Sequence, residues 1–266
     1  MVQAWFVSLM AGLATSIGGV LAVTRRELSR PWLAVSLAFS SGAMLMVSFM
    51  EIMPLSISTL SQTYPPGTAM GVTYLAFFIG IAVVMLIDRL LPSQLNPNET
   101  EGRGQFSDDD RTRTTRLLRS GLLVALVLAL HNFPEGMATF LATYSDPAMG
   151  LTLAAAIAIH NVPEGIAVAA PVFAATGSRG KALWWATLSG LTEPVGALLA
   201  AGLITWVIPP SLLGVVYGLV AGMMVFLALD ELLPGAWRYQ TDKHQTIYGM
   251  VAGMFVVALS LILFAL

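Results

Sequence analysis

The hexapeptide HNFPEG occupies residues 131–136 of the chain, and a near copy, HNVPEG, occupies residues 160–165. Each copy lies in the middle of a long apolar run. An ionisable side chain in the middle of a lipid bilayer is unfavourable by roughly 2.5–3.5 kcal/mol on insertion scales, so such residues usually mark a functional site. Two His, two Asn and two Glu in matched positions therefore indicate a metal site on a transport path.

The composition of the chain is typical of an integral membrane protein. Of its 266 residues, 56% are hydrophobic and 11% are charged, whereas soluble domains carry about 25% charged residues. Such a chain cannot cover a surface that faces water. The absence of Cys excludes disulfides and thiolate metal ligands, and the net charge of −2 indicates no nucleic-acid partner. The fourteen Met are expected to be mostly packing or lipid-facing residues.

Runs of about 20 apolar residues predict eight transmembrane helices, and hence an all-α membrane protein with one transporter domain over residues 1–266. The expected spans, each to within a few residues, are about 3–23, 32–54, 69–91, 121–144, 148–173, 182–206, 211–234 and 246–266. The polar stretch 92–120, between the third and fourth spans, is predicted to be a flexible cytoplasmic loop without chemistry of its own.

Positive charge is confined to alternate connections of this arrangement. All 13 Lys and Arg lie in or next to the connections between spans one and two, three and four, five and six, and seven and eight. The other connections carry none. Because Lys and Arg accumulate in cytoplasmic loops, both termini are expected on the non-cytoplasmic side of the membrane.

A second self-similarity links spans two and seven. Residues 42–54 (GAMLMVSFMEIMP) and 222–234 (GMMVFLALDELLP) both follow the pattern G-x8-E-x-x-P. Because these two spans are expected to run in opposite directions, the pattern would occur in opposite orientations. It therefore predicts that spans one to three and six to eight form an inverted repeat around the central spans four and five, as in many secondary transporters.

The two hexapeptides can each present metal ligands on one helix face. Residues three and four apart share a face, so each Glu lies beside the His and Asn of its motif. Imidazole, carboxylate and amide oxygens suit borderline divalent metals such as zinc. The two prolines are expected to kink their helices, and Gly136 and Gly165 should permit close helix packing. Glu193, in SGLTEPVGA, falls at a similar depth in span six. The predicted ligands are His131, Asn132, Glu135, His160, Asn161, Glu164 and Glu193.

These ligands could hold a pair of metal ions. Glu135 and Glu164 would bridge the two ions. The two His would then bind one ion, and the two Asn would bind the other together with Glu193. One ion could be the cargo and the other a structural or auxiliary ion.

Three further acids are interpreted as parts of the transport path. Glu51 lies near the outer face and would take up metal at the entrance, while Asp230 and Glu231 lie near the inner face and would release it. The alternative is that these acids only lie at the membrane interfaces or cap neighbouring helices. A lone membrane His is often only a hydrogen-bond partner between helices, but six polar groups at matched spacing are not explained in that way.

The motifs resemble those of the ZIP (Zrt/Irt-like protein) family of metal transporters, most of all its bacterial ZupT-like branch. The resemblance rests on HNFPEG, HNVPEG, SGLTEPVGA, SFMEIMP and LALDELLP, and it covers essentially the whole chain. It implies an eight-helix protein of the bacterial inner membrane, with both termini outside, that forms a homodimer. It also implies a binuclear site on the seven ligands named above. Many members carry a His-rich loop between spans three and four, but residues 92–120 contain no His.

The function that the resemblance implies is alternating-access transport of divalent metal, chiefly zinc, into the cytoplasm, with an elevator-like motion. Cadmium, iron, manganese and cobalt are further candidate substrates. Protons compete with metal for carboxylates and imidazoles, and the residues do not decide between proton coupling and facilitated diffusion. The expected partners are the metal substrate, the lipid bilayer and a second copy of the chain.

The main alternative is an intramembrane metal-dependent enzyme. Zinc proteases use H-E-x-x-H, which is absent, and di-iron bundles use E-x-x-H, whereas the order here is H-x-x-x-E. A metal sensor or receptor would need an exposed signalling domain, and none is evident in the sequence. A transporter rather than an enzyme is therefore expected.

Overall fold

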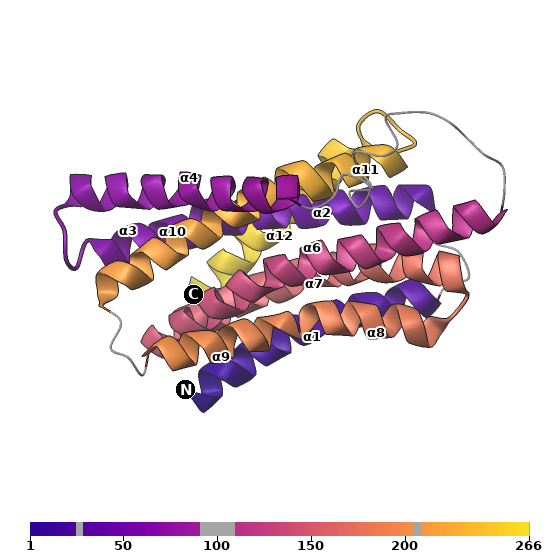
Figure 1. The fold of residues 1–266 in the computed structure, drawn as a ribbon. Coiled ribbons are helices and arrows are strands. Elements are labelled where there is room, and N and C mark those ends of the chain that lie inside the picture. Colours follow the sequence, from indigo (N-terminus) through magenta and orange to yellow (C-terminus); the bar gives the residue numbers. More distant parts are fainter. Residues whose placement is uncertain (25–28, 91–109, 205–208, 266) are drawn as a thin grey trace.

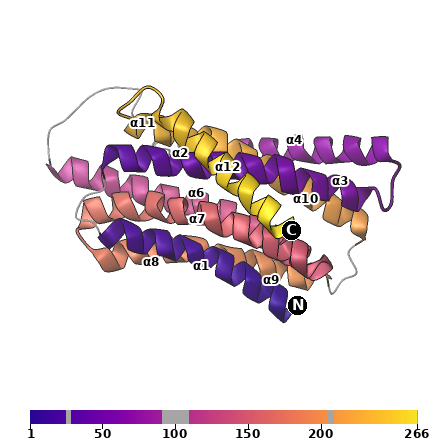
Figure 2. The ribbon, with the colours of Figure 1, turned by 180° about the vertical axis from the view of Figure 1, so that it is seen from behind.

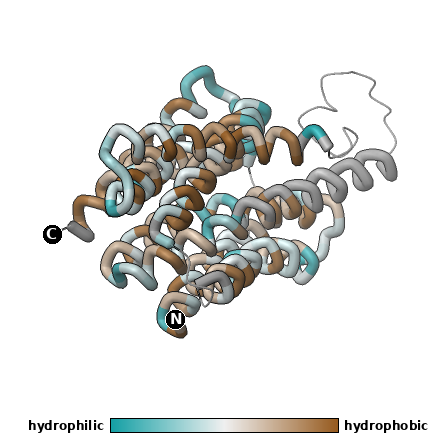
Figure 3. Tube along the Cα trace, turned by 60° about the vertical axis from the view of Figure 1, so that its left-hand side comes forward, coloured by the Kyte–Doolittle hydropathy of each residue, from teal (hydrophilic) through white to brown (hydrophobic). Residues whose placement is uncertain are grey.

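The computed structural model describes residues 1–24, 29–90, 110–204 and 209–265. Within these ranges the chain is helical and contains no β-strand, so the prediction of an all-α protein is confirmed for them. Hydrophobic residues run along the helices, and hydrophilic residues gather mainly in the turns (Figure 3). The elements are α1 (Val2–Thr24), α2 (Arg30–Val47), η1 (Ser48–Ile52), α3 (Met53–Leu60), α4 (Pro66–Leu90), α6 (Asp110–Ser145), α7 (Pro147–Thr176), α8 (Arg179–Gly190), α9 (Thr192–Ile204), α10 (Pro210–Leu227), η2 (Ala228–Leu232), α11 (Leu233–Tyr239) and α12 (Gln245–Ala265).

Six helical stretches among the described residues are long and apolar enough to cross a membrane, which confirms a multi-pass membrane protein. They are Val2–Thr24, Arg30–Leu60, Pro66–Ile87, Pro147–Thr176, Ser211–Tyr239 and Gln245–Leu263. The two other expected spans, 121–144 and 182–206, fall on α6 and on the successive helices α8 and α9, as far as the structure describes them. The count of eight spans stays a prediction.

Helix α6 begins before the fourth expected span. Residues 110–120, which belong to the stretch predicted to be a loop, are the first part of this helix. The rest of that stretch lies outside the described residues, so its flexibility stays a prediction. An early start is compatible with a span, because charged residues are tolerated where a helix extends beyond the lipid.

The ends of α7 follow from its sequence. Asp146 precedes the helix, and its carboxylate accepts hydrogen bonds from the backbone N–H groups of Ala148 and Met149 at 2.9 and 3.2 Å. Pro147 occupies the first position, where a missing N–H has no consequence. Gly177 ends the helix with a left-handed backbone, φ 62°, and the chain enters α8 directly afterwards.

The helices form two groups that lie side by side along their length (Figures 1 and 2). One group, called here the motif group, contains α1, α6, α7, α8 and α9. The other, the flanking group, contains α2, α3, α4, α10, α11 and α12. The two groups touch where α7 packs against α2 and α12 and where α6 packs against α10. The sequence motif HN-x-PEG thus belongs to one group and G-x8-E-x-x-P to the other.

Two π-helical turns interrupt the flanking group at matching positions. η1 lies between α2 and α3, and η2 lies between α10 and α11; both cover the same positions of the pattern G-x8-E-x-x-P. The N–H of Met53 bonds to the Ser48 carbonyl, and the N–H of Leu233 bonds to the Ala228 carbonyl. The next residue of each helix is Pro, which has no N–H to restore the α-helical register. The wide turn is therefore built into the motif.

Reciprocal glycine contacts hold the flanking helices together. A Cβ on Gly42 of α2 would overlap the Met250 carbonyl of α12, and a Cβ on Gly222 of α10 would overlap the Phe77 carbonyl of α4. The return contacts are those of Gly253 with the Phe39 carbonyl and of Gly80 with the Leu219 carbonyl. Small residues allow membrane helices to approach this closely. The pair α2 and α12 and the pair α10 and α4 therefore cross in the same way.

Candidate metal site

Both HN-x-PEG motifs lie within continuous helices. Residues 131–136 belong to α6 and residues 160–165 belong to α7, and these two helices pack against each other (Figure 1). Pro134 and Pro163 lie inside the helices, and each removes the N–H that would bond to the carbonyl four residues earlier. The predicted kinks stay a prediction, but the prolines supply carbonyl oxygens with spare bonding capacity beside the motifs.

The glycines of the two motifs bring further helices to the site. A Cβ on Gly165 would overlap the carbonyl oxygen of Thr15 in α1, and a Cβ on Gly136 would overlap that of Glu193 in α9. The space at both positions fits only a hydrogen atom, as predicted from the sequence. The motif glycines thus fix α1 against α7 and α9 against α6, which sets the depth of Glu193.

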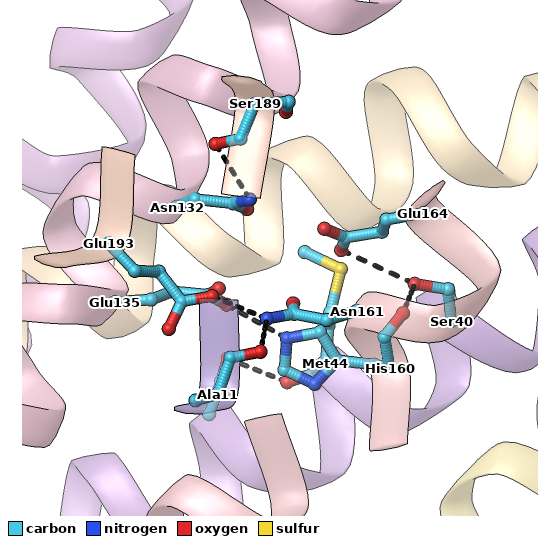
Figure 4. Close-up of polar contacts among 11 residues, drawn as sticks. Ala11, Ser40, Met44, Asn132, Glu135, His160, Asn161, Glu164, Ser189 and Glu193 are labelled. Carbon is cyan, nitrogen blue, oxygen red and sulfur yellow. Dashed lines mark hydrogen bonds and ion pairs between the residues drawn. The ribbon is translucent and has the colours of Figure 1, made fainter. Parts of the chain in front are cut away.

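A direct contact joins the two motifs. His160 Nε2 of α7 lies 3.0 Å from Glu135 Oε1 of α6, and both side chains are completely buried (Figure 4). When the imidazole is neutral, Nε2–H donates to the carboxylate; when it is protonated, the contact is an ion pair. An imidazole and a carboxylate at this separation can bind one divalent ion between them after the ring loses its Nε2 proton.

Glu193 reaches the same region from the start of α9. The long helix expected over 182–206 is interrupted at Leu191, so Glu193 occupies the first turn of a new helix. Free N–H groups and the helix dipole favour a carboxylate there. The Asn161 amide donates to Glu193 Oε1 and, at 3.0 Å, to the Ala11 carbonyl of α1 (Figure 4). The second motif is thereby joined to α9 and α1.

Asn132 of the first motif is also fully buried. In one amide orientation its Nδ2 donates to the Ser189 carbonyl at 3.3 Å. In the reversed orientation Nδ2 donates to Glu164 Oε2 at 3.3 Å and to the Leu128 carbonyl at 3.1 Å. The reversed orientation is favoured because the amide oxygen otherwise faces only acceptors, and it exchanges the bond to Ser189 for the bonds to Glu164 and Leu128. It links Asn132 of α6 to Glu164 of α7.

The described part of the chain brings six of the seven predicted ligands into one buried polar region between α6, α7 and α9 (Figure 4). They are Asn132, Glu135, His160, Asn161, Glu164 and Glu193. The side chain of His131 lies outside the described residues. Asn161 Oδ1 and Glu193 Oε2 are buried and accept no hydrogen bond from the described residues. Among these residues, no three His, Asp or Glu side chains already meet as a metal cluster, so the ligand set stays a prediction.

The site also includes two residues of α2 that the sequence analysis did not identify. Ser40 donates its hydroxyl towards the His160 carbonyl and Glu164 Oε1, and the thioether of Met44 lies among the same side chains (Figure 4). Both residues are completely buried. The available signal was the run FSSGAM at 39–44, in which two hydroxyl residues stand side by side in a largely apolar span.

The three acids predicted for the transport path lie on the π-helical turns of the flanking group. Glu51 is half-buried on η1. On η2, Asp230 is exposed and Glu231 is half-buried. Single π-helical turns occur frequently at functional sites. Whether these acids contact metal stays a prediction.

Comparison with known families identifies the chain. The sequence model of the ZIP zinc transporter family matches residues 2–105 and 92–261. The chain belongs to the ZIP family. It is 50% identical over 265 residues to the zinc transporter ZupT of Corynebacterium glutamicum, an alignment that covers 99% of this chain and 100% of that protein. The proteins of the same name from Chlorobium chlorochromatii and Streptococcus mutans are 46% and 42% identical, each over 98% of this chain and 97% of the relative.

Membership of the ZIP family confirms two predictions. The resemblance drawn from the short motifs was correct, and it extends over nearly the whole chain. The chain is a membrane transporter rather than an intramembrane enzyme, since the family and its curated members are transporters. The buried polar region between α6, α7 and α9 is accordingly the candidate substrate site.

Proposed function

We propose that this ZIP protein carries divalent metal, chiefly zinc, from outside into the cytoplasm by alternating access through a binuclear site at mid-membrane. The observation that carries the proposal is the buried contact of His160 with Glu135, beside the bonded pair Asn161 and Glu193. Nitrogen and oxygen ligands without thiolate bind zinc and admit iron, manganese, cobalt and cadmium. These other metals are proposed as secondary substrates.

In the proposed site, two metal ions are bound by ligands from both motifs. In this proposal two carboxylates, those of Glu135 and Glu164, bridge the ions. The coordination of one ion is completed by His131 and His160. The coordination of the other is completed by Asn132, Asn161 and Glu193. The cross-helix contacts support this division, because Glu135 lies against His160 and the Asn161 amide lies against Glu193. Glu51 is proposed to capture metal at the outer side, and Asp230 and Glu231 to release it at the inner side.

The proposed architecture has eight spans, with the first three and the last three related as an inverted repeat. Helix α6 and the successive helices α8 and α9 supply the two spans beyond the six apolar ones. The matched π-helical turns η1 and η2 support the repeat, as do the matched glycine crossings of α2 with α12 and of α10 with α4. In the proposed repeat, span two corresponds to span seven and span eight corresponds to span three. The crossing of α2 with α12 therefore corresponds to the crossing of α10 with α4.

We further propose that the protein lies in the bacterial inner membrane as a homodimer, with both termini outside. The turn between α7 and α8 and the turn between α11 and α12 lie at the same end of the molecule (Figure 1). Arg179 and Lys181 follow the first turn, Arg238 precedes the second and Lys243 lies within it. Because basic residues favour the cytoplasmic side, this end is assigned to the cytoplasm. The homodimer is proposed from the family resemblance alone.

A flux experiment tests the proposed transport. The purified protein, reconstituted into liposomes that contain a zinc-sensitive dye, should give zinc influx well above that of protein-free liposomes. The same assay with cadmium, iron, manganese and cobalt, and with an imposed pH gradient, measures the substrate range and proton coupling. Expression in zinc-limited bacteria that lack their own importers should raise cytoplasmic zinc, which tests the direction. Zinc flux equal to that of empty liposomes would refute the proposal.

Replacement of His160 by Gln should lower the preference for zinc over manganese by about tenfold, because imidazole suits zinc whereas oxygen ligands suit manganese. The measurement is the ratio of the two uptake rates in competition. The matched control is His244→Gln, since His244 is exposed in the turn between α11 and α12. An unchanged ratio in the His160 variant would show that the imidazole does not bind the transported ion.

A further inference from the structure

A buried serine lies on the seam between the two helix groups, directly beside the candidate site. Ser40 of α2 is completely buried. Its hydroxyl oxygen lies 3.3 Å from the carbonyl oxygen of His160 and 3.4 Å from Glu164 Oε1 (Figure 4). A hydroxyl has a single proton to donate, so it is shared between these two acceptors. Both acceptors belong to the second HN-x-PEG motif on α7.

The next residue along the chain makes a different kind of contact. Ser41 is equally buried, but its hydroxyl donates to the Ala228 carbonyl of η2 at 3.0 Å. Helix α2 and η2 both belong to the flanking group, so this bond stays within one group. Ser40 instead bonds across the seam to the motif group. Two adjacent serines with the same side chain and the same burial therefore bond to different helix groups.

Both oxygens of Glu164 face donors from other helices. Oε1 faces the hydroxyl of Ser40 on α2, and Oε2 faces the amide of Asn132 on α6 in the orientation that satisfies that amide. A carboxylate offers about four lone-pair sites, so these two donors restrict its orientation without filling its acceptor capacity. Donors that orient a metal-binding group commonly change metal affinity by about 10–100-fold.

We propose that Ser40 is a positioning residue that orients Glu164 for metal binding while α2 and α7 are in contact as seen here. The proposal rests on the proposed function, because it assigns Glu164 to the substrate site. Its consequence is a link between metal affinity and the packing of the two helix groups. When the groups are in contact, the Ser40 hydroxyl helps to hold Glu164; when α2 moves relative to α7, that donor is removed and the carboxylate is held less firmly.

Removal of the hydroxyl should weaken metal binding and leave the maximal rate nearly unchanged. Ser40→Ala is expected to raise the KM for zinc uptake by about tenfold, at the lower end of the range for orienting residues because the contact to Glu164 is long. The maximal rate should stay within about twofold, since the ligands themselves remain. Titration of zinc into the purified protein in detergent should show the same loss of affinity.

Ser41→Ala is the matched control, because it removes a buried hydroxyl of the same helix that does not reach the site. It should leave the KM for zinc unchanged. Ser40→Thr keeps a hydroxyl and should bring the KM back towards the wild-type value, whereas Ser40→Gly should reproduce the effect of the Ala variant. The thermal midpoint of each variant separates loss of folding from loss of affinity, and the zinc titration applies even to a variant that no longer transports.

Two results would overturn the proposal. One is an unchanged KM and zinc affinity in folded Ser40→Ala protein. The other is an equal change in the Ser40 and Ser41 variants, which would indicate a general packing effect on α2. Either result is compatible with normal zinc uptake by the wild-type protein and therefore does not contradict the proposed function. Absence of uptake by the wild-type protein would instead refute the proposed function itself.

Discussion

Replacement of Glu135 by Gln is expected to lower the rate of zinc uptake into liposomes by at least about 100-fold while the protein remains folded. Glu135 is completely buried and lies 3.0 Å from His160, and the proposed site uses it to bridge two ions. Gln has nearly the same shape but no charge, and a neutral amide oxygen binds a divalent ion much more weakly. Loss of an orienting group alone commonly costs about 10–100-fold, so loss of a bridging ligand should have a larger effect.

The measurement is the initial zinc influx at saturating and at low zinc, together with the thermal midpoint and the gel-filtration profile. Asp242→Asn is a suitable control, since Asp242 is an exposed carboxylate in the turn between α11 and α12. It should transport at the wild-type rate. Wild-type uptake by a folded Glu135→Gln protein would exclude Glu135 as a bridging ligand.

Replacement of Gly165 by Ala should destabilise the protein and lower its thermal midpoint by about 2–12 °C. A Cβ at this position meets the Thr15 carbonyl oxygen and also lies 3.0 Å from the backbone nitrogen of Gly19. Backbone atoms cannot turn aside as a flexible side chain can, so α1 must move away from α7. Overpacking of this kind costs roughly 1–3 kcal/mol, and each kcal/mol corresponds to about 2–4 °C in a chain of comparable size.

Zinc uptake by the Gly165 variant should fall as well, because displacement of α1 separates the Ala11 carbonyl from the Asn161 amide. The control is Gly180→Ala in α8, where an added Cβ meets no atom within 4 Å. This change should keep or slightly raise the thermal midpoint, since Ala is the better helix former. An equal midpoint for both variants would contradict the close packing of α1 and α7.

Short-range patterns predicted which residues of each motif share a helix face, and the ligand assignment itself stays a prediction. The spacing within HNFPEG and HNVPEG placed Glu beside His and Asn, and the structure adds that Glu135 meets His160 of the other copy. The break at Leu191, which divides the expected sixth span into α8 and α9, was not predicted. Its signals were present, since Gly190 precedes Thr192 and Pro194, and such residues end one helix and begin the next. A search for runs of about 20 apolar residues averages the hydropathy over the whole run, so these local signals are lost.

The role of Ser40 could not be read from the sequence for a physical reason. A hydroxyl within a helix usually bonds to the carbonyl four residues earlier, as Ser48 does with Met44 at 2.8 Å. Ser40 instead bonds to a helix 120 residues away. Its partner depends on how α2 and α7 lie against each other, which helical periodicity does not specify. The same holds for the burial of Met44 beside the site.

The π-helical turns determine which way the residues that follow the acids of the flanking group face. A π-helical turn holds one residue more than an α-helical turn, and each residue of an α-helix corresponds to about 100° of rotation and 1.5 Å of rise. Pro54 and Pro234, next along the chain, cannot supply the N–H that would remove the extra residue. A helical wheel drawn straight through α2 and η1 would therefore place the residues beyond Glu51 about a quarter-turn from their true direction. The same error would arise beyond Glu231, so surface maps of these two spans must be drawn separately on either side of the wide turn.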